Sequence, residues 1–319
     1  MTSDAKDTLS ETVAEPKRHS FLVDVLIRLV KEKPLGTIGG IIVLVLFLTG
    51  ILADFLAPYA MNEIHLFDRL SPPSAHYILG TDQLGRDILS NIIYGARISV
   101  IIGVCASTID VIAAIIIGAL SGFIGGKLDM TVQRFVDAWM SFPSILITMT
   151  VMTIVGRGLG QVIAVIGLSH GIRSSRVVRS AVIGIKENVY VEAAEAVGCS
   201  MTRVLIRHIL PNIMAPVIII FTIGMGAAIL VESTMSFLGF GVPPGIPSWG
   251  SMLSGEGRQY MEVAPQLALW PGFALSIVVY GINMFGDALR DLLDPRLRGG
   301  LGRYSRTKKR QKLEAKVKK

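Results

Sequence analysis

The chain of 319 residues is 51% hydrophobic and 17% charged, with a mean hydropathy of +0.57. The net charge is +7, but no nucleic-acid recognition motif accompanies it, so nucleic-acid binding is not indicated. The two cysteines argue against a disulfide framework or a cysteine-based metal site. Several apolar runs approach the roughly 20 residues that a bilayer-spanning helix needs. The sequence therefore predicts an all-α polytopic membrane protein, embedded in lipid and with no nucleic-acid partner.

Six membrane spans are expected after a polar N-terminal tail, residues 1–33, which we expect to be partly disordered. The spans cover Pro34–Leu56, Ile98–Ile124, Phe135–Val155, Gln161–Leu168 with a polar continuation, Met214–Leu238 and Leu267–Phe285. The first span follows a long polar tail and has too long an apolar core for a secretory signal, so we expect it to remain as an anchor.

Basic residues set the expected orientation, because Lys and Arg concentrate in cytoplasmic segments. They are frequent in the N-terminal tail, in the segment 186–213 and in the C-terminal tail, residues 292–319, and they are rare in the segments 59–78 and 239–266. Both termini and the segment 186–213 are therefore expected in the cytoplasm of a multi-pass cell-membrane protein. The basic C-terminal tail is interpreted as a topological anchor, with attraction to anionic lipid as the alternative.

The expected external loop ends in the run HYILGTDQLGRDILS, His76–Ser90. Its residue types suit an interfacial helix that begins near Asp87 with a capped start. We therefore expect the segment 34–96 to hold the first span, an external loop and this interfacial helix. A second external run, Glu232–Gly250, is rich in Gly and Pro and predicts a rigid turn-rich segment in which Trp249 anchors at the membrane interface.

Asp110 lies in the middle of the second span, where an ionisable side chain is costly and marks a functional or buried polar site. A structural polar contact is the favoured interpretation, and a place on a translocation path is the alternative. Further along the same span, Gly118 and Gly122 form a G-x-x-x-G face that allows close helix packing, within the subunit or across a dimer.

The run EAAEAVGCSMTRVLIRHILPN, Glu192–Asn212, predicts a helix, a tight turn and a second helix. The first helix stops at Gly198, Ser200 offers an N-cap for the second, and Pro211 is expected to end it. A polar helical loop of this kind, placed between apolar spans, is suited to being held by a partner.

These residues closely resemble the EAA loop in the membrane-spanning subunits of binding-protein-dependent ABC importers. The matching positions are Glu192, Ala193, Ala194, Gly198, Leu210 and Pro211. His208 departs from the general pattern, but the ending His-Ile-Leu-Pro-Asn is similar to that of the peptide-importer branch. The runs 76–90, 232–250 and 286–300 also resemble the C-type permease of the dipeptide, oligopeptide and nickel group.

The resemblance implies a type I ABC importer fold over residues 97–291, with the coupling loop at 186–213. It also implies three kinds of protein partner: a second homologous permease, two ATPase subunits and an extracytoplasmic solute-binding protein. Contact with the binding protein is then a hypothesis for the external residues Asp82, Arg86, Asp87 and Trp249. The implied function is ATP-driven import of dipeptides or oligopeptides by alternating access.

The chain is not expected to be an enzyme, because its nearest approach to a P-loop, around Gly126 and Lys127, lacks the required spacing. ATP and Mg are thus expected to serve the partner ATPases, and no catalytic residue, metal ligand or bound cofactor is assigned here. Nickel or oligosaccharide import by the same group remains an alternative. A different class, a homo-oligomeric channel or secondary transporter, would suit Asp110 but would leave the EAA loop without a role.

Overall fold

The computed structural model describes residues 21–254, 259–260 and 262–293, and parts of both expected tails, 1–20 and 294–319, lie outside them. In this part of the chain the regular elements are helices, and one isolated β-bridge joins Thr81 to Asp87. The longer helices are α1 (Phe21–Glu32), α2 (Pro34–Ile51), α4 (Ile88–Ile124), α5 (Gly126–Met140), α6 (Ser144–Val155), α7 (Leu159–Lys186), α10 (Met214–Phe237) and α13 (Gln266–Leu293). The shorter helices are α3 (Ala53–Leu56), α8 (Val189–Ala196), α9 (Met201–Val204) and α11 (Trp249–Leu253), with 3-10 turns at Leu66–Asp68 and Leu210–Ile213 and a π-helical turn at Leu205–Ile209.

The all-α class is confirmed, but the count of six spans is not. Among the described residues, four helical stretches are long and apolar enough to cross a membrane: α2, α4, the run Met201–Phe237 and α13. A fifth span results if the bent pair α5 and α6 is counted as one. The expected fourth span forms α7, a continuous helix of 28 residues whose second half carries the polar continuation.

The expected third span, Phe135–Val155, is wrong as a single helix. Helix α5 ends at Met140, α6 begins at Ser144, and the two are bent by 91°. Pro143 explains the break, because it lacks a backbone N–H and disfavours helical geometry in the preceding Phe142.

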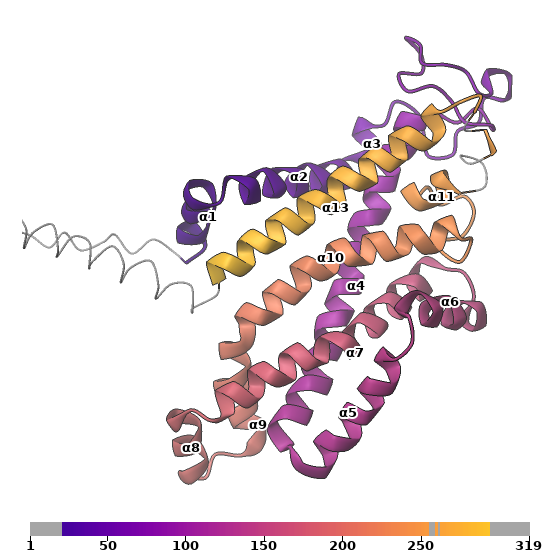
Figure 1. The fold of residues 1–319 in the computed structure, drawn as a ribbon. Coiled ribbons are helices and arrows are strands. Elements are labelled where there is room, and N and C mark those ends of the chain that lie inside the picture. The colour runs from indigo at the N-terminus through magenta and orange to yellow at the C-terminus, as the bar shows by residue number, and fades with distance from the viewer. Residues whose placement is uncertain (1–20, 255–258, 261, 294–319) are drawn as a thin grey trace, which may run out of the picture.

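The helix expected near Asp87 does begin there, since the Asp87 side chain accepts a hydrogen bond from the Ser90 backbone N–H at 2.8 Å. It does not form a separate interfacial element. Helix α4 runs on for 37 residues to Ile124, so the expected boundary between residues 96 and 97 falls inside one helix. Figure 1 shows α4 crossing the bundle between the loop that follows α3 and the end that carries α8 and α9.

Small residues allow α4 and α7 to pack closely along their lengths. A Cβ atom added at Gly118 would meet the backbone of Ser175 and Arg179, and one at Gly122 would meet the backbone of Arg179. In the facing helix α7, Gly171 lies against the backbone of Asp110 in α4. The G-x-x-x-G face therefore packs within the subunit, against α7, as close helix approach through small residues permits. Helices α2 and α13 form a second close pair (Figure 1), in which Gly39 lies against the backbone of Gly281 and Phe285.

An ion pair fastens the short helix α3 to α4. The Arg97 guanidinium donates two hydrogen bonds to the Asp54 carboxylate, at 3.1 and 2.7 Å. This bidentate geometry is the most favourable one for an Arg–carboxylate pair. It lowers the pKa of the Asp54 carboxyl below its usual value of 3.8, against a smaller opposing effect of desolvation.

We expect this contact to make the protein acid-sensitive. A carboxyl whose pKa is lowered by folding stabilises the folded state above its usual pKa, and that stabilisation is lost as pH falls through the folded value. Thermal unfolding in detergent should therefore show a larger loss of stability between about pH 6 and about pH 3 for the wild type than for Asp54→Asn. Equal losses in the two proteins would show that the pair contributes nothing.

Candidate functional site

A helical hairpin, Val189–Val204, projects at the end of the bundle where α7 finishes (Figure 1). Its first helix, α8, ends at Ala196, and Gly198 follows with a φ of +87°, a left-handed conformation that favours glycine. Two backbone hydrogen bonds close the turn: Gly198 N–H donates to Glu195 O at 2.9 Å and Cys199 N–H to Ala194 O at 3.0 Å. The predicted helix, turn and helix are confirmed.

The start of the second helix is only partly as predicted. Ser200 occupies the N-cap position of α9, but its side chain makes no capping hydrogen bond. Pro211 does not end the element, because the π-helical turn and the 3-10 turn carry the chain directly into α10. Such non-α turns accommodate a proline, whose missing N–H removes one hydrogen bond of a regular helix.

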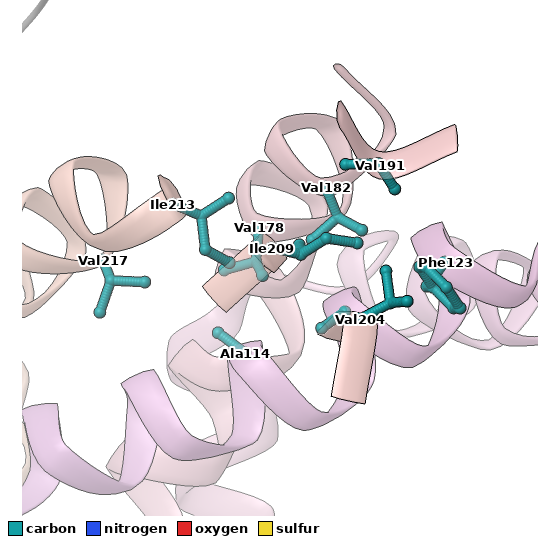
Figure 2. Close-up of a cluster of buried hydrophobic side chains, with 10 residues drawn as sticks. Ala114, Phe123, Val178, Val182, Val191, Val204, Ile209, Ile213 and Val217 are labelled. Atoms are coloured by element: carbon teal, nitrogen blue, oxygen red, sulfur yellow. The ribbon is translucent and has the colours of Figure 1, made fainter. Parts of the chain in front are cut away.

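A buried apolar cluster anchors the hairpin to the bundle. Val191 of α8 is 1% exposed and Val204 of α9 is fully buried, and both belong to a cluster with side chains from α4, α7 and α10. Figure 2 shows these side chains grouped between the hairpin and the bundle helices: Ala114, Phe123, Val178, Val182, Ile209, Ile213 and Val217. Because the interior of a protein is closely packed, displacement of the hairpin moves the helices that share this cluster.

The opposite face of the hairpin is open. Val197 is 86% exposed and Val189 is 79% exposed, and the neighbouring Glu192, Ala193 and Gly198 are exposed as well. A knob of small and apolar side chains with one carboxylate can enter a cleft on another protein, with little side-chain entropy lost on binding. Of the other matching positions, Ala194 and Leu210 pack partly against the buried cluster, and Pro211 is exposed.

Asp110 lines a cavity of about 680 Å³ between the helices of the bundle. The other polar residues of its wall come from three helices: Ser144 of α6, His170, Arg173 and Ser174 of α7, and Arg290 of α13. Helix α10 supplies an apolar wall that includes Ile219, Ile220 and Ile223. Asp110 is 2% exposed, and its Oδ1 atom has no hydrogen-bond partner in the described part of the chain. The sequence singled out Asp110, but it did not show that Arg290 faces the same cavity.

Three of the four residues expected to contact a binding protein are buried inside the subunit, which favours a structural role for them over contact with a partner. Asp82 is 7% exposed and accepts hydrogen bonds from the backbone N–H groups of Leu84 and Arg86, both at 2.8 Å, and from the Arg86 side chain. Asp87 is 3% exposed and caps α4. Arg86 retains 21% exposure of its side chain and, with Asp82, lines a second cavity of about 460 Å³.

Trp249 does not anchor at a membrane interface in this structure, because it is only 2% exposed. Its ring lies against Gly95 of α4, and its Nε1–H donates to the Ile92 carbonyl at 3.1 Å. Gly95 has no side chain, and this leaves room for the ring. Burial of the large indole ring stabilises the fold, because its N–H keeps a hydrogen-bond partner.

Trp249→Phe should lower stability by about 1 kcal/mol, because the ring still packs while the hydrogen bond to Ile92 is lost. Trp270→Phe is a matched control: Trp270 is 39% exposed, so its change should stay within about 0.5 kcal/mol. Unfolding of the purified variants in detergent measures both. An unchanged Trp249→Phe protein would show that the hydrogen bond contributes no net stability.

No group of three or more His, Cys, Asp or Glu side chains that could hold a metal ion occurs in the part of the chain that the structure describes.

Two family models match the chain. The model described as the binding-protein-dependent transport system inner membrane component matches residues 114–299, which include both the hairpin and most of the cavity wall. The model of the N-terminal transmembrane domain of oligopeptide transport permease C matches residues 20–73.

Individual proteins are similar over nearly the whole chain. The dipeptide transport system permease protein of Alkalihalophilus pseudofirmus is 38% identical over 90% of this chain and 92% of its own. The oligopeptide transport system permease protein of Bacillus subtilis is 36% identical over 88% of this chain and 92% of its own. Among solved structures, the inward-facing MetNI methionine ABC transporter matches with a TM-score of 0.52 and 19% identity, over 64% of this chain and 96% of that chain, and this likeness concerns the fold.

Proposed function

Because the chain belongs to the family of binding-protein-dependent transport system inner membrane components, we propose that it is a permease subunit for dipeptides or oligopeptides. The observation that carries this proposal is the 38% identity to a dipeptide permease over 90% of the chain. The oligopeptide permease relative supports the same cargo class. Nickel and oligosaccharides remain alternative cargoes of similar permeases.

We propose that the hairpin Val189–Val204 is the joint through which a separate ATPase drives transport. Its exposed face, with Glu192, Ala193 and Gly198, would enter a cleft on the ATPase. Its buried face shares one apolar cluster with α4, α7 and α10. Closure of two ATPase subunits would thus move the helices that surround Asp110, and the solute would gain access to alternate sides of the membrane. ATP and Mg would be used by those subunits, with no cofactor held by this chain.

The remaining partners follow from the same proposal. A second homologous permease would enclose the pathway together with this chain, and an extracytoplasmic binding protein would deliver the solute. Arg86, with 21% of its side chain exposed, is the most accessible member of this group and would face that protein, while Asp82, Asp87 and Trp249 support the surface from within. Both termini and the hairpin would face the cytoplasm of a cell-membrane protein, in agreement with the positions of its basic residues.

Purification of the chain from its native membrane, with identification of the proteins that accompany it, tests the assembly. Reconstitution of that complex into vesicles then tests the cargo. We expect ATPase subunits, a second permease and a binding protein to be recovered, and we expect ATP-dependent uptake of dialanine. A lone homo-oligomer that conducts without ATP would overturn the proposal in favour of the channel or secondary-transporter alternative.

A further inference from the structure

The cavity beside Asp110 contains a carboxylate with unused hydrogen-bonding capacity. Ser174 is the hydrogen-bonding neighbour of this side chain, and Gly224 of α10 leaves open the space next to Oδ2. Oδ1 has no partner among the described residues although it is inaccessible at the atomic level. Burying an ionised carboxylate is costly unless donors compensate it. Asp110 and Gly224 both line the cavity, so a donor bound there would approach the carboxylate from the side of Oδ2 and lower that cost.

Two guanidinium groups line the same cavity, and neither has an ion-pair partner among the residues that the structure covers: Arg173 and Arg290. The other arginines of the same stretch of α7 behave differently. Arg176 pairs with Asp137, and Arg179 pairs with Asp129 at 2.5 Å. The arginines that face α5 are thus neutralised within the subunit, whereas those at the cavity are available to an anion.

The helix register places the acidic and basic groups at different depths. Gly224 of α10 lies against Asp110. Gly226 and Gly286 show that α10 and α13 are antiparallel neighbours, because Gly226 packs on Ile282 and Gly286 packs on Ile223. Arg290 lies one turn beyond Gly286, which brings it to the level of Ile219. Five residues at 1.5 Å separate that level from Gly224, about 7.5 Å along the axis. Two extended peptide residues span about 7 Å.

Building on the proposed function, we propose that this cavity is a transit site that binds both charged ends of a short peptide. The peptide α-ammonium donates to Asp110, its C-terminal carboxylate accepts from Arg290 with Arg173 beside it, and its side chains contact the apolar wall of α10. An uncharged oligosaccharide would leave all three charged groups without a partner of opposite charge. The site therefore selects a zwitterion of about two residues, in addition to any selection by a binding protein.

The proposal is tested by a comparison of modified peptides with modified residues. The probes are dialanine, N-acetyl-dialanine and dialanine amide, and their affinity is measured for the purified nucleotide-free importer complex without binding protein. We expect N-acetylation to weaken binding to the wild type by about tenfold or more, as loss of a charge-assisted hydrogen bond does. The same modification should have little effect in Asp110→Asn. C-terminal amidation should weaken binding to the wild type but not to Arg290→Gln, since a removed interaction cannot be removed twice.

Arg134→Gln is the matched control, because Arg134 lies on α5 and does not line the cavity, so both modifications should act in it as in the wild type. Equal effects of capping in the wild type and in both cavity variants would overturn the proposal, as would no detectable binding of dialanine to a complex that takes it up. If Asp110→Asn does not assemble, the arm with Arg290→Gln decides alone. Failure of the proposed function looks different: the wild-type complex with its binding protein would take up no dialanine.

Discussion

Gly198→Trp is expected to abolish ATP-driven uptake while the protein still inserts and folds. Gly198 lies at the tip of the exposed hairpin with a φ of +87°, and a Cβ atom added there meets nothing within 4 Å. The indole therefore fits in the isolated subunit but occupies the surface that would enter the ATPase. We expect ATPase binding in detergent to weaken by about 2 kcal/mol or more, the scale of a central interface position.

Gly198→Ala separates the effect of the ring from that of the backbone. Both variants bear the cost of a left-handed residue, about 1–2 kcal/mol, but only tryptophan adds bulk at the surface. Alanine should therefore keep most of the ATPase binding, measured by co-purification and by uptake in vesicles. Normal assembly and uptake in Gly198→Trp would remove the hairpin from the coupling mechanism.

Local signals explain why the hairpin could be predicted from the sequence. A helical run and one glycine in a left-handed turn fix α8 and the turn without distant contacts, and Ser200 marks the N-cap position of α9 although its side chain makes no capping hydrogen bond. The bend at Pro143 has an equally local cause. The apolar run 135–155, however, is long enough for one span, and its length alone predicts a single helix. Hydropathy measures the length of an apolar run, and it does not register a break within that run.

The cavity could be predicted only in part, because its wall is assembled from five helices. Asp110 stood out as an isolated charge in an apolar run. Arg290 lies 180 residues further along the chain, and only the register of α10 against α13 brings it to the same cavity. The burial of Trp249 likewise depends on the absence of a side chain at Gly95, a contact between distant residues that no local pattern records.

One continuous set of contacts joins the hairpin to the cavity. Val191 and Val204 pack in the cluster that includes Ala114 of α4, which lies one helical turn from Asp110. Ile220 of α10 packs against the same cluster and also lines the cavity. A shift of the hairpin is thus transmitted to the cavity wall through side chains in direct contact, provided that α4 and α7 move as one unit.

The rigidity of that unit leads to the second large effect, the loss of folded protein in Gly118→Val. A side chain at position 118 would meet the backbone of Ser175 and Arg179, which cannot rotate away as a flexible side chain does. Helices α4 and α7 would have to separate, at a cost of at least the roughly 1–3 kcal/mol of an overpacked core. We expect little folded protein in the membrane fraction, as judged by the yield of monodisperse protein after detergent extraction.

Gly184→Val provides the control for helix propensity, because Gly184 lies in α7 and an added Cβ meets nothing within 4 Å. Both substitutions place a β-branched residue in a helix, so their effects on intrinsic propensity are alike. A normal yield for Gly184→Val with a low yield for Gly118→Val would therefore assign the loss to the contact between α4 and α7. If both yields are normal, the two helices can separate without loss of the fold, and the hairpin cannot act on the cavity through a rigid pair.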